Sequence, residues 1–193
     1  MERIYVHATI FPRFVAAFVK AVKGFKIGDP MKDSTYLGPI TRPAQIEVLE
    51  AQVKDARKKG ARVLLGGGRV PRRPGYFQPT VLVDVDHTMT VMREESFGPV
   101  VGLMAVRDDA EAVALMNDTD YGLTAGVYTP DRRRAESVLA QVKSGTSYWN
   151  CCDRVSPRLP WSGVGQSGIG VTLSTHGIQA FTRPRAWHLR GAR

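Results

Sequence analysis

Two neighbouring cysteines, Cys151 and Cys152, are the residues of the chain best suited to nucleophilic chemistry, since a thiolate attacks carbonyl carbons readily. A reactive cysteine needs a lowered pKa, supplied by a helix N-terminus or a nearby cation. Arg154 lies close by in the sequence, but Asp153 beside it offsets its charge. On these grounds a nucleophile stays possible, but we favour two small buried residues in a loop.

A second candidate is the acidic pair Glu94 and Glu95, which precedes the residues Ser96-Phe97-Gly98-Pro99. Carboxylates accept hydrogen bonds in pairs, so an acidic corner beside an aromatic ring would suit a hydroxyl-rich ligand. A solvated acidic turn has the same spacing, and on spacing alone we favour that interpretation.

The glycine-rich segment GVGQSG, residues 163–168, fits the G-x-G-x-x-G pattern of dinucleotide-binding loops. That pattern requires a preceding strand, a long following helix and an acidic residue about 20 positions further on. Prolines stand before the segment, any following helix must fit between Gly170 and Gly177, and no acidic residue follows. We therefore expect a backbone turn that packs closely against other elements.

The composition is that of an ordinary globular protein, with 43% hydrophobic and 23% charged residues. No apolar run approaches the roughly 18 residues of a membrane span, and the first residues lack a secretion signal, so we expect a cytoplasmic protein. Two cysteines are too few for a disulfide framework. The four histidines have no metal-ligand spacing, and the sequence predicts no metal site.

The net charge of +9 is concentrated at the end of the chain. Residues 154–193 contain six arginines and no acidic residue, which leaves +3 for the first 153 residues. A basic tail is typical of nucleic-acid binding or of a partner that supplies the balancing acid. Trp187 and Leu189 alternate with Ala186 and His188 as in a packed strand, so we favour the second interpretation and expect no nucleic-acid partner.

Apolar spacing predicts the elements that must position these residues. Helices should begin at Phe11, at Pro43 with Thr41 as N-cap, at Asp108 or Asp109, and near Ala135. Strands should cover 3–7, 61–65, 77–83, 100–106, 125–128 and 146–150. Strands that alternate with helices predict an α/β fold with a parallel sheet and helices on its faces.

Several longer motifs occur in order along the chain: GDPMKDSTYLGPI, EESFGPVVG, NDTDYGLTAGVYT, GTSYWN and PWSGVGQSGIG. Together with ERIYVH at the front they resemble the NAD(P)-dependent aldehyde dehydrogenase family over essentially the whole chain. The resemblance implies a three-layer catalytic-domain segment over residues 1–183, and a C-terminal oligomerisation strand and tail over 184–193.

The resemblance also assigns roles. Glu95 would accept both hydroxyls of the nicotinamide ribose of NAD or NADP, and Phe97 would pack against the nicotinamide end. Cys152, Val155 and Trp161 would line the entrance for the aldehyde. One departure is Pro160-Trp161-Ser162-Gly163, where the family usually has Pro-Phe-Gly-Gly; tryptophan keeps an aromatic wall.

In the family, a cysteine attacks the aldehyde, hydride passes to the nicotinamide and a glutamate activates water. The resemblance implies that this cysteine and glutamate lie upstream of Met1, so the chain would contain no catalytic residue and would be inactive alone. The implied partners are the aldehyde and further copies of the chain in a dimer or tetramer. The alternatives are a non-catalytic assembly module or a nucleic-acid-binding protein with a basic tail.

Overall fold

The computed structural model describes residues 2–151 and 154–191. The chain divides into two compact units, Met1–Asp118 and Thr119–Arg193, and each is described by itself. The predicted boundary at 183/184 divides a catalytic-domain segment from an oligomerisation strand by function, and it does not coincide with the boundary between the two compact units. This functional division stays a prediction. Among the described residues, no helix combines the length and the apolar character needed to cross a membrane.

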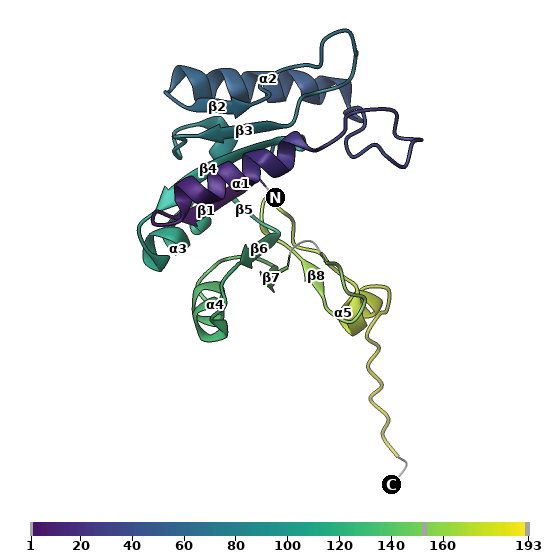
Figure 1. Cartoon of the computed structure of the whole chain (residues 1–193). Coiled ribbons are helices and arrows are strands. Elements are labelled where there is room, and N and C mark those ends of the chain that lie inside the picture. Colours follow the sequence, from purple (N-terminus) through teal and green to yellow (C-terminus); the bar gives the residue numbers. More distant parts are fainter. Residues whose placement is uncertain (1, 152–153, 192–193) are drawn as a thin grey trace. The chain divides into compact units, whose positions relative to one another are not determined.

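The first unit is built on a sheet of four strands in the order β1-β4-β3-β2 (Figure 1). Their bounds are β1 Arg3–His7, β2 Arg62–Leu65, β3 Thr80–Val83 and β4 Val100–Val106. β4 pairs in parallel with both β1 and β3, as predicted, whereas β2 pairs antiparallel with β3. The predicted parallel sheet thus carries one antiparallel edge strand, because a loop rather than a crossover helix joins β2 to β3.

Helices cover both faces of this sheet, so the predicted three-layer arrangement is confirmed. Val81 and Val83 of β3 belong to the core formed with α1, Phe11–Lys23. Leu82, between them, belongs to the core formed with α2, Pro43–Lys58. Successive side chains of a strand point to opposite faces, which is why three consecutive apolar residues supply two separate cores.

Prolines set two boundaries that the sequence prediction misplaced. α2 has Pro43 in its first turn, and the N-cap is Arg42 with an extended backbone, not Thr41. A proline restricts the residue before it to extended angles, and Arg42 therefore becomes the cap. The predicted strand 77–83 shortens to Thr80–Val83, because Pro79 has no amide to donate to a ladder.

An aspartate cap begins each of the next two helices. Asp108 accepts a hydrogen bond from the Glu111 amide at 2.8 Å at the start of α3, Asp109–Asn117. Asp131 accepts from the amides of Arg133 and Arg134 at the start of α4, Arg132–Leu139. Such caps satisfy amides that the first helical turn leaves free.

The second unit contains a parallel pair, β6 Thr124–Val127 and β7 Thr146–Trp149, connected through α4. Two short antiparallel pairs follow, β5 Tyr121–Gly122 with β9 Val164–Gly165, and β8 Trp161–Ser162 with β10 Val171–Thr172. The last helix is α5, Ser174–Gln179.

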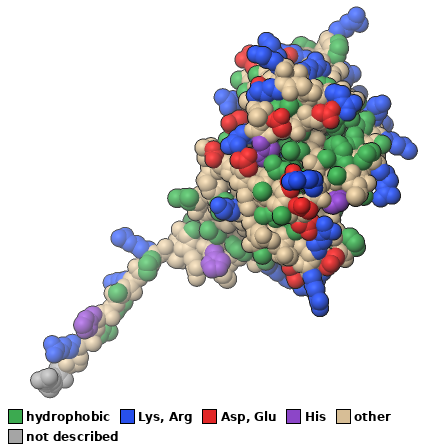
Figure 2. Space-filling view, turned by 90° about the vertical axis from the view of Figure 1, so that its left-hand side faces the viewer, with side chains coloured by type: hydrophobic (Ala, Val, Ile, Leu, Met, Phe, Trp, Pro, Cys, Tyr) green, Lys and Arg blue, Asp and Glu red, His purple; other side chains and the backbone are tan. Residues whose placement is uncertain are grey.

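The tail after α5 is extended, and within the described residues it pairs with no strand (Figure 1). The oligomerisation strand expected within residues 184–193 thus has no strand partner among the described residues, and it stays a prediction, because an extended segment becomes a strand only with a hydrogen-bonded partner. The Trp187 and Leu189 side chains are 67% and 81% exposed. Figure 2 shows hydrophobic and basic side chains in succession along this tail.

Candidate functional site

Both predicted cofactor-binding residues lie on one loop of the first unit. The loop covers residues 93–99, between the short helix η1, Thr90–Met92, and the start of β4. Its end is fixed to the sheet, since the Thr80 amide donates to the Pro99 carbonyl at 2.7 Å. The loop therefore starts from a buried turn and runs directly into the central strand.

The loop passes so close to α2 that one position requires glycine. A Cβ added at Gly98 would lie 2.5 Å from Leu49 Cδ1, and Leu49 is fully buried. The residue before it, Phe97, has a φ of 43° and is 71% exposed. Backbone strain of this kind clusters at active sites and ligand-binding loops.

Hydrogen bonds from two directions reach the main chain of this loop. From α2, Gln45 Nε2 donates to the Ser96 carbonyl at 2.7 Å, and Gln52 Nε2 donates to the Glu95 carbonyl at 3.5 Å. From the residue before β1, the carboxylate of Glu2 accepts from the amides of Ser96 and Phe97. These bonds hold the backbone and leave the Glu95 and Phe97 side chains available.

The Glu95 carboxyl group has a raised pKa. Burial is the main cause, and the negative charges of Glu2 and Glu94 add to it. Within the described part of the chain, its oxygens accept no hydrogen bond. The Glu95 side chain is thus partly buried, has oxygens free to accept hydrogen bonds and lies near two other negative charges. These properties are typical of a carboxylate in a ligand-binding site.

The predicted substrate-binding residues lie in the second unit. Val155 is 57% exposed in the loop after β7, and Trp161 begins β8. At the start of this loop, Asn150 has a φ of 52°, and its side chain bonds both the amide and the carbonyl of Thr129. Cys151 is a half-buried free thiol. Cys152 lies outside the described residues.

The structure bears out the prediction of a tight turn for the GVGQSG segment. A Cβ at Gly163 would lie 2.8 Å from the Ser167 carbonyl oxygen, and Gly165 and Gly168 have φ of 59° and 104°. The Ser167 hydroxyl accepts from the Gly122 amide at 3.0 Å. The glycines serve this close packing, and the next helix begins only at Ser174.

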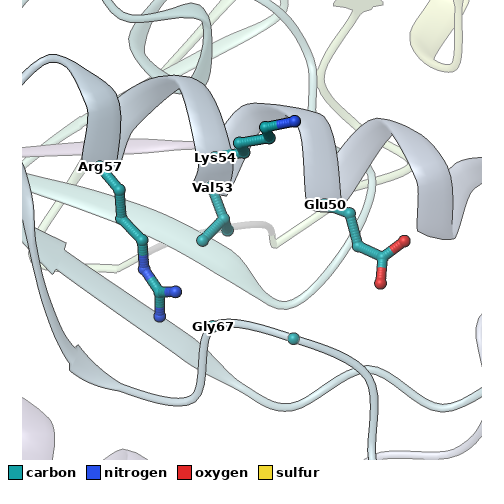
Figure 3. A pocket seen from close by; sticks show the side chains of 6 residues that line it. Glu50, Val53, Lys54, Arg57 and Gly67 are labelled. Carbon is teal, nitrogen blue, oxygen red and sulfur yellow. The ribbon is translucent and has the colours of Figure 1, made fainter.

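An open groove runs between α2 and the glycine-rich loop after β2 (Figure 3). Its lining residues are Glu50, Val53, Lys54, Arg57, Gly67 and Gly68. Arg57 extends towards Gly67, while Glu50 is paired with Arg69 through two bonds of 2.8 Å. None of the predicted site residues lines this groove. Within the described ranges, no three His, Cys, Asp or Glu side chains gather as metal ligands.

A polar network lies beside the site, between β1 and the end of α3. His87 Nδ1 donates to Asp118 at 2.6 Å, and its Nε2 lies 2.8 Å from the Tyr5 hydroxyl. Arg93 donates to the other Asp118 oxygen at 3.0 Å. Burial raises the pKa of Tyr5 to about 12, and the His87 hydrogen bond, followed by that of Arg93, lowers the pKa of Asp118.

This network predicts a pH-dependent loss of stability in Asp118→Asn. A lowered carboxyl pKa stabilises the folded state above the unfolded-state value, and the contribution disappears as pH falls through the folded-state pKa. At pH 7 the variant should lose about 1 kcal/mol of unfolding free energy, the upper end for exposed ion pairs. As pH falls below the ordinary aspartate pKa of 3.8 the difference should shrink, and it should vanish once the pH is below the lowered folded-state pKa. Urea unfolding across this range tests it, with Asp33→Asn, an exposed aspartate, as control.

Spacing did not reveal the residues that hold the loop, namely Glu2, Gln45 and Gln52. Their partners lie 94, 51 and 43 positions away in the sequence. One signal was available: Gln52 occurs on the same helix face as Leu49 and Val53 and is 3% exposed. A buried glutamine on an apolar face requires a hydrogen-bond partner.

Comparison with known proteins identifies the class. The model of the aldehyde dehydrogenase family matches residues 1–187, and the chain belongs to this family. A betaine aldehyde dehydrogenase of Brucella melitensis is 39% identical over 173 residues, which are 87% of this chain and 35% of the relative.

Solved structures give the same result. Betaine aldehyde dehydrogenase from Staphylococcus aureus in complex with NAD+ superimposes with a TM-score of 0.88 at 33% identity, covering 93% of this chain and 37% of that chain. Lactaldehyde dehydrogenase from Escherichia coli gives a TM-score of 0.90 at 35% identity, with 93% and 38% covered. The chain thus spans about a third of the length of its relatives.

Proposed function

We propose that the chain is the part of an NAD(P)-dependent aldehyde dehydrogenase that holds the nicotinamide ribose and lines the aldehyde entrance. The whole protein would oxidise an aldehyde to a carboxylic acid. The observation that carries the proposal is the Glu95 carboxylate, partly buried and without a donor among the described residues, beside the strained Phe97. Membership of the family and a solved neighbour in complex with NAD+ support it.

The residues of the loop fit a ribose. Two neighbouring hydroxyls are two donors, and a carboxylate has two oxygens to accept them. Hydroxyl donors would also relieve the burial cost that raises the pKa of Glu95. No cationic side chain bonds Glu95 among the described residues, so a neutral diol meets no competitor there.

The bound cofactor would supply the hydride acceptor. The chain's own residues would orient it: Glu95 by its two acceptors, and Phe97 by contact of its exposed ring with the nicotinamide end. In the second unit, Val155 and Trp161 would give the entrance an apolar and an aromatic wall, with Cys152 beside them. Holding a reactive ring at a fixed angle is worth several kcal/mol in a transfer reaction, of order 7–11 at the limit.

The experiment is an assay of the protein purified from its own source. Relatives named for betaine aldehyde and lactaldehyde make small polar aldehydes the first substrates to test. We expect aldehyde-dependent formation of NADH or NADPH, followed by the absorbance of the reduced cofactor, and a preference between the two cofactors. Absence of reduction with both cofactors across a panel of aldehydes would contradict the proposal.

We also propose that the tail pairs with a second copy of the chain. Exposed Trp187 and Leu189 alternate along an extended segment that has no strand partner among the described residues. The double variant Trp187→Ser, Leu189→Ser should lower the oligomeric mass measured by sedimentation velocity. Arg190→Ser, which keeps the apolar pair, should not. An unchanged mass in the double variant would exclude this role.

A further inference from the structure

Glu2 is the one acidic side chain that reaches the main chain of the cofactor loop among the described residues. It stands just before β1, which pairs with the central strand β4. Its Oε2 accepts from the Ser96 amide at 3.1 Å, and its Oε1 accepts from the Phe97 amide at 3.4 Å. Both carboxylate oxygens are therefore used to fix two successive amides of the loop.

The two hydrogen bonds from Glu2 are important because of the backbone positions that they hold. They fall on the residue after Glu95 and on Phe97 itself, where φ is 43°. Successive amides that converge on one anion are a stable arrangement, and bonds to a charged acceptor are stronger than neutral ones. They therefore oppose relaxation of the strained backbone that presents the Phe97 ring.

The bonds from α2 do not duplicate this function. Gln45 and Gln52 donate to the carbonyls of Ser96 and Glu95, whereas Glu2 accepts from amides on the opposite side of the same peptides. Next to Glu2, Arg3 donates to the Met92 carbonyl at 3.1 Å. The loop is thus held from β1 and from α2, and each side contacts a different set of backbone groups.

We propose that Glu2 is a positioning residue that sets the placement of Glu95 and Phe97 through the Ser96 and Phe97 amides. This rests on the proposed function, because it gives the loop its cofactor. The charge of Glu2 acts on Glu95 as well: it contributes to the raised pKa of that carboxyl group, after burial. Removal of Glu2 therefore has two separate consequences, one geometric and one electrostatic.

Amide hydrogen exchange of the 193-residue chain, read residue by residue by NMR, tests the geometric consequence. Glu2→Gln keeps one acceptor oxygen and removes the charge, and Glu2→Ala removes both. We expect exchange at Ser96 and Phe97 to become about tenfold faster in Glu2→Ala, with a smaller increase in Glu2→Gln. Amides within β4, such as Leu103, should keep their rates, which shows that the sheet is intact.

Glu94→Gln is the matched control, because Glu94 is exposed and adjacent to Glu95 but bonds no amide of the loop. Carbon-detected titration should show the pKa of Glu95 falling in both Glu2→Gln and Glu94→Gln. Only the Glu2 variants should change exchange at Ser96 and Phe97. Unchanged exchange at these two amides in Glu2→Ala would overturn the proposal.

The experiments distinguish an error in the role of Glu2 from an error in the proposed function of the chain. Exchange and titration need no cofactor, so they report on Glu2 alone. In the protein purified from its source, Glu2→Gln should raise the KM for the cofactor about fivefold, because a misplaced acceptor weakens binding of the ribose. An unchanged cofactor KM with faster exchange would overturn the positioning role. If Glu95→Gln also left that KM unchanged, the ribose assignment itself would fall.

Discussion

The Glu95→Gln variant of the protein purified from its source should lose about 100-fold in kcat/KM for aldehyde oxidation. Glutamine has the same shape but only one acceptor oxygen, so it cannot accept from both ribose hydroxyls. A ribose held by one bond lets the nicotinamide ring move, and a displacement of about 1 Å costs on the order of 100-fold in rate. Steady-state kinetics with varied cofactor measures the effect.

Glu94→Gln serves as the control for charge, since it removes the neighbouring carboxylate and should stay within about twofold of the native rate. The loss in Glu95→Gln should not arise from unfolding. Because the folded-state pKa of Glu95 is raised, the ionised group costs stability, and this cost grows as pH rises through the ordinary glutamate range. At pH 7 the glutamine variant should be as stable as the native protein or slightly more so. Equal activity of the two variants would contradict the ribose assignment.

Gly145→Ala should destabilise the second unit by about 3 kcal/mol or more. Gly145 lies directly before β7, and an added Cβ would overlap the backbone carbonyl of Ser162 in β8. Backbone atoms of a paired strand cannot move aside as the end of a flexible side chain can. The Gly145 amide also donates to the Gly122 carbonyl at 3.0 Å, so a shift of Gly145 would break this bond too.

Gly170→Ala is the matched control in the same unit, because nothing lies within 4 Å of its added Cβ. It should change the unfolding free energy by no more than about 0.5 kcal/mol. Urea unfolding followed by the fluorescence of the tryptophans would report the difference, since Trp149 and Trp161 both lie in strands of this unit. Equal stability of the two variants would show that β8 does not pack against Gly145 as described.

Local patterns predicted most of the elements. α1 and β4 follow from the spacing of apolar residues alone, and their bounds agree closely with the structure. The patterns did not predict which strands pair with one another. The antiparallel pairing of β2, for example, depends on the loop that joins it to β3. The tail shows the same limit, since Trp187 and Leu189 alternate like a strand but pair with no strand among the residues that the structure describes.

Some residues of the candidate site were predicted from the sequence, and others became apparent only in the folded structure. Glu95 and Phe97 were found because a motif carried them, whereas spacing alone favoured a solvated turn. Glu2 and Gln45 were not found, because their role depends on contacts that only the folded sheet creates. The roles of Val155, Trp161 and Cys152, and the inactivity expected of the chain alone, stay predictions.

A crystal structure of the protein from its source with NAD+ bound would test the central claim most directly. We predict that both oxygens of Glu95 lie within hydrogen-bond distance, about 2.5–3.2 Å, of the two hydroxyls of the nicotinamide ribose. The Phe97 ring should contact the nicotinamide end, and Glu2 should still accept from the Ser96 and Phe97 amides. A cofactor whose nicotinamide ribose bonds other residues, with Glu95 turned to solvent, would contradict the assignment.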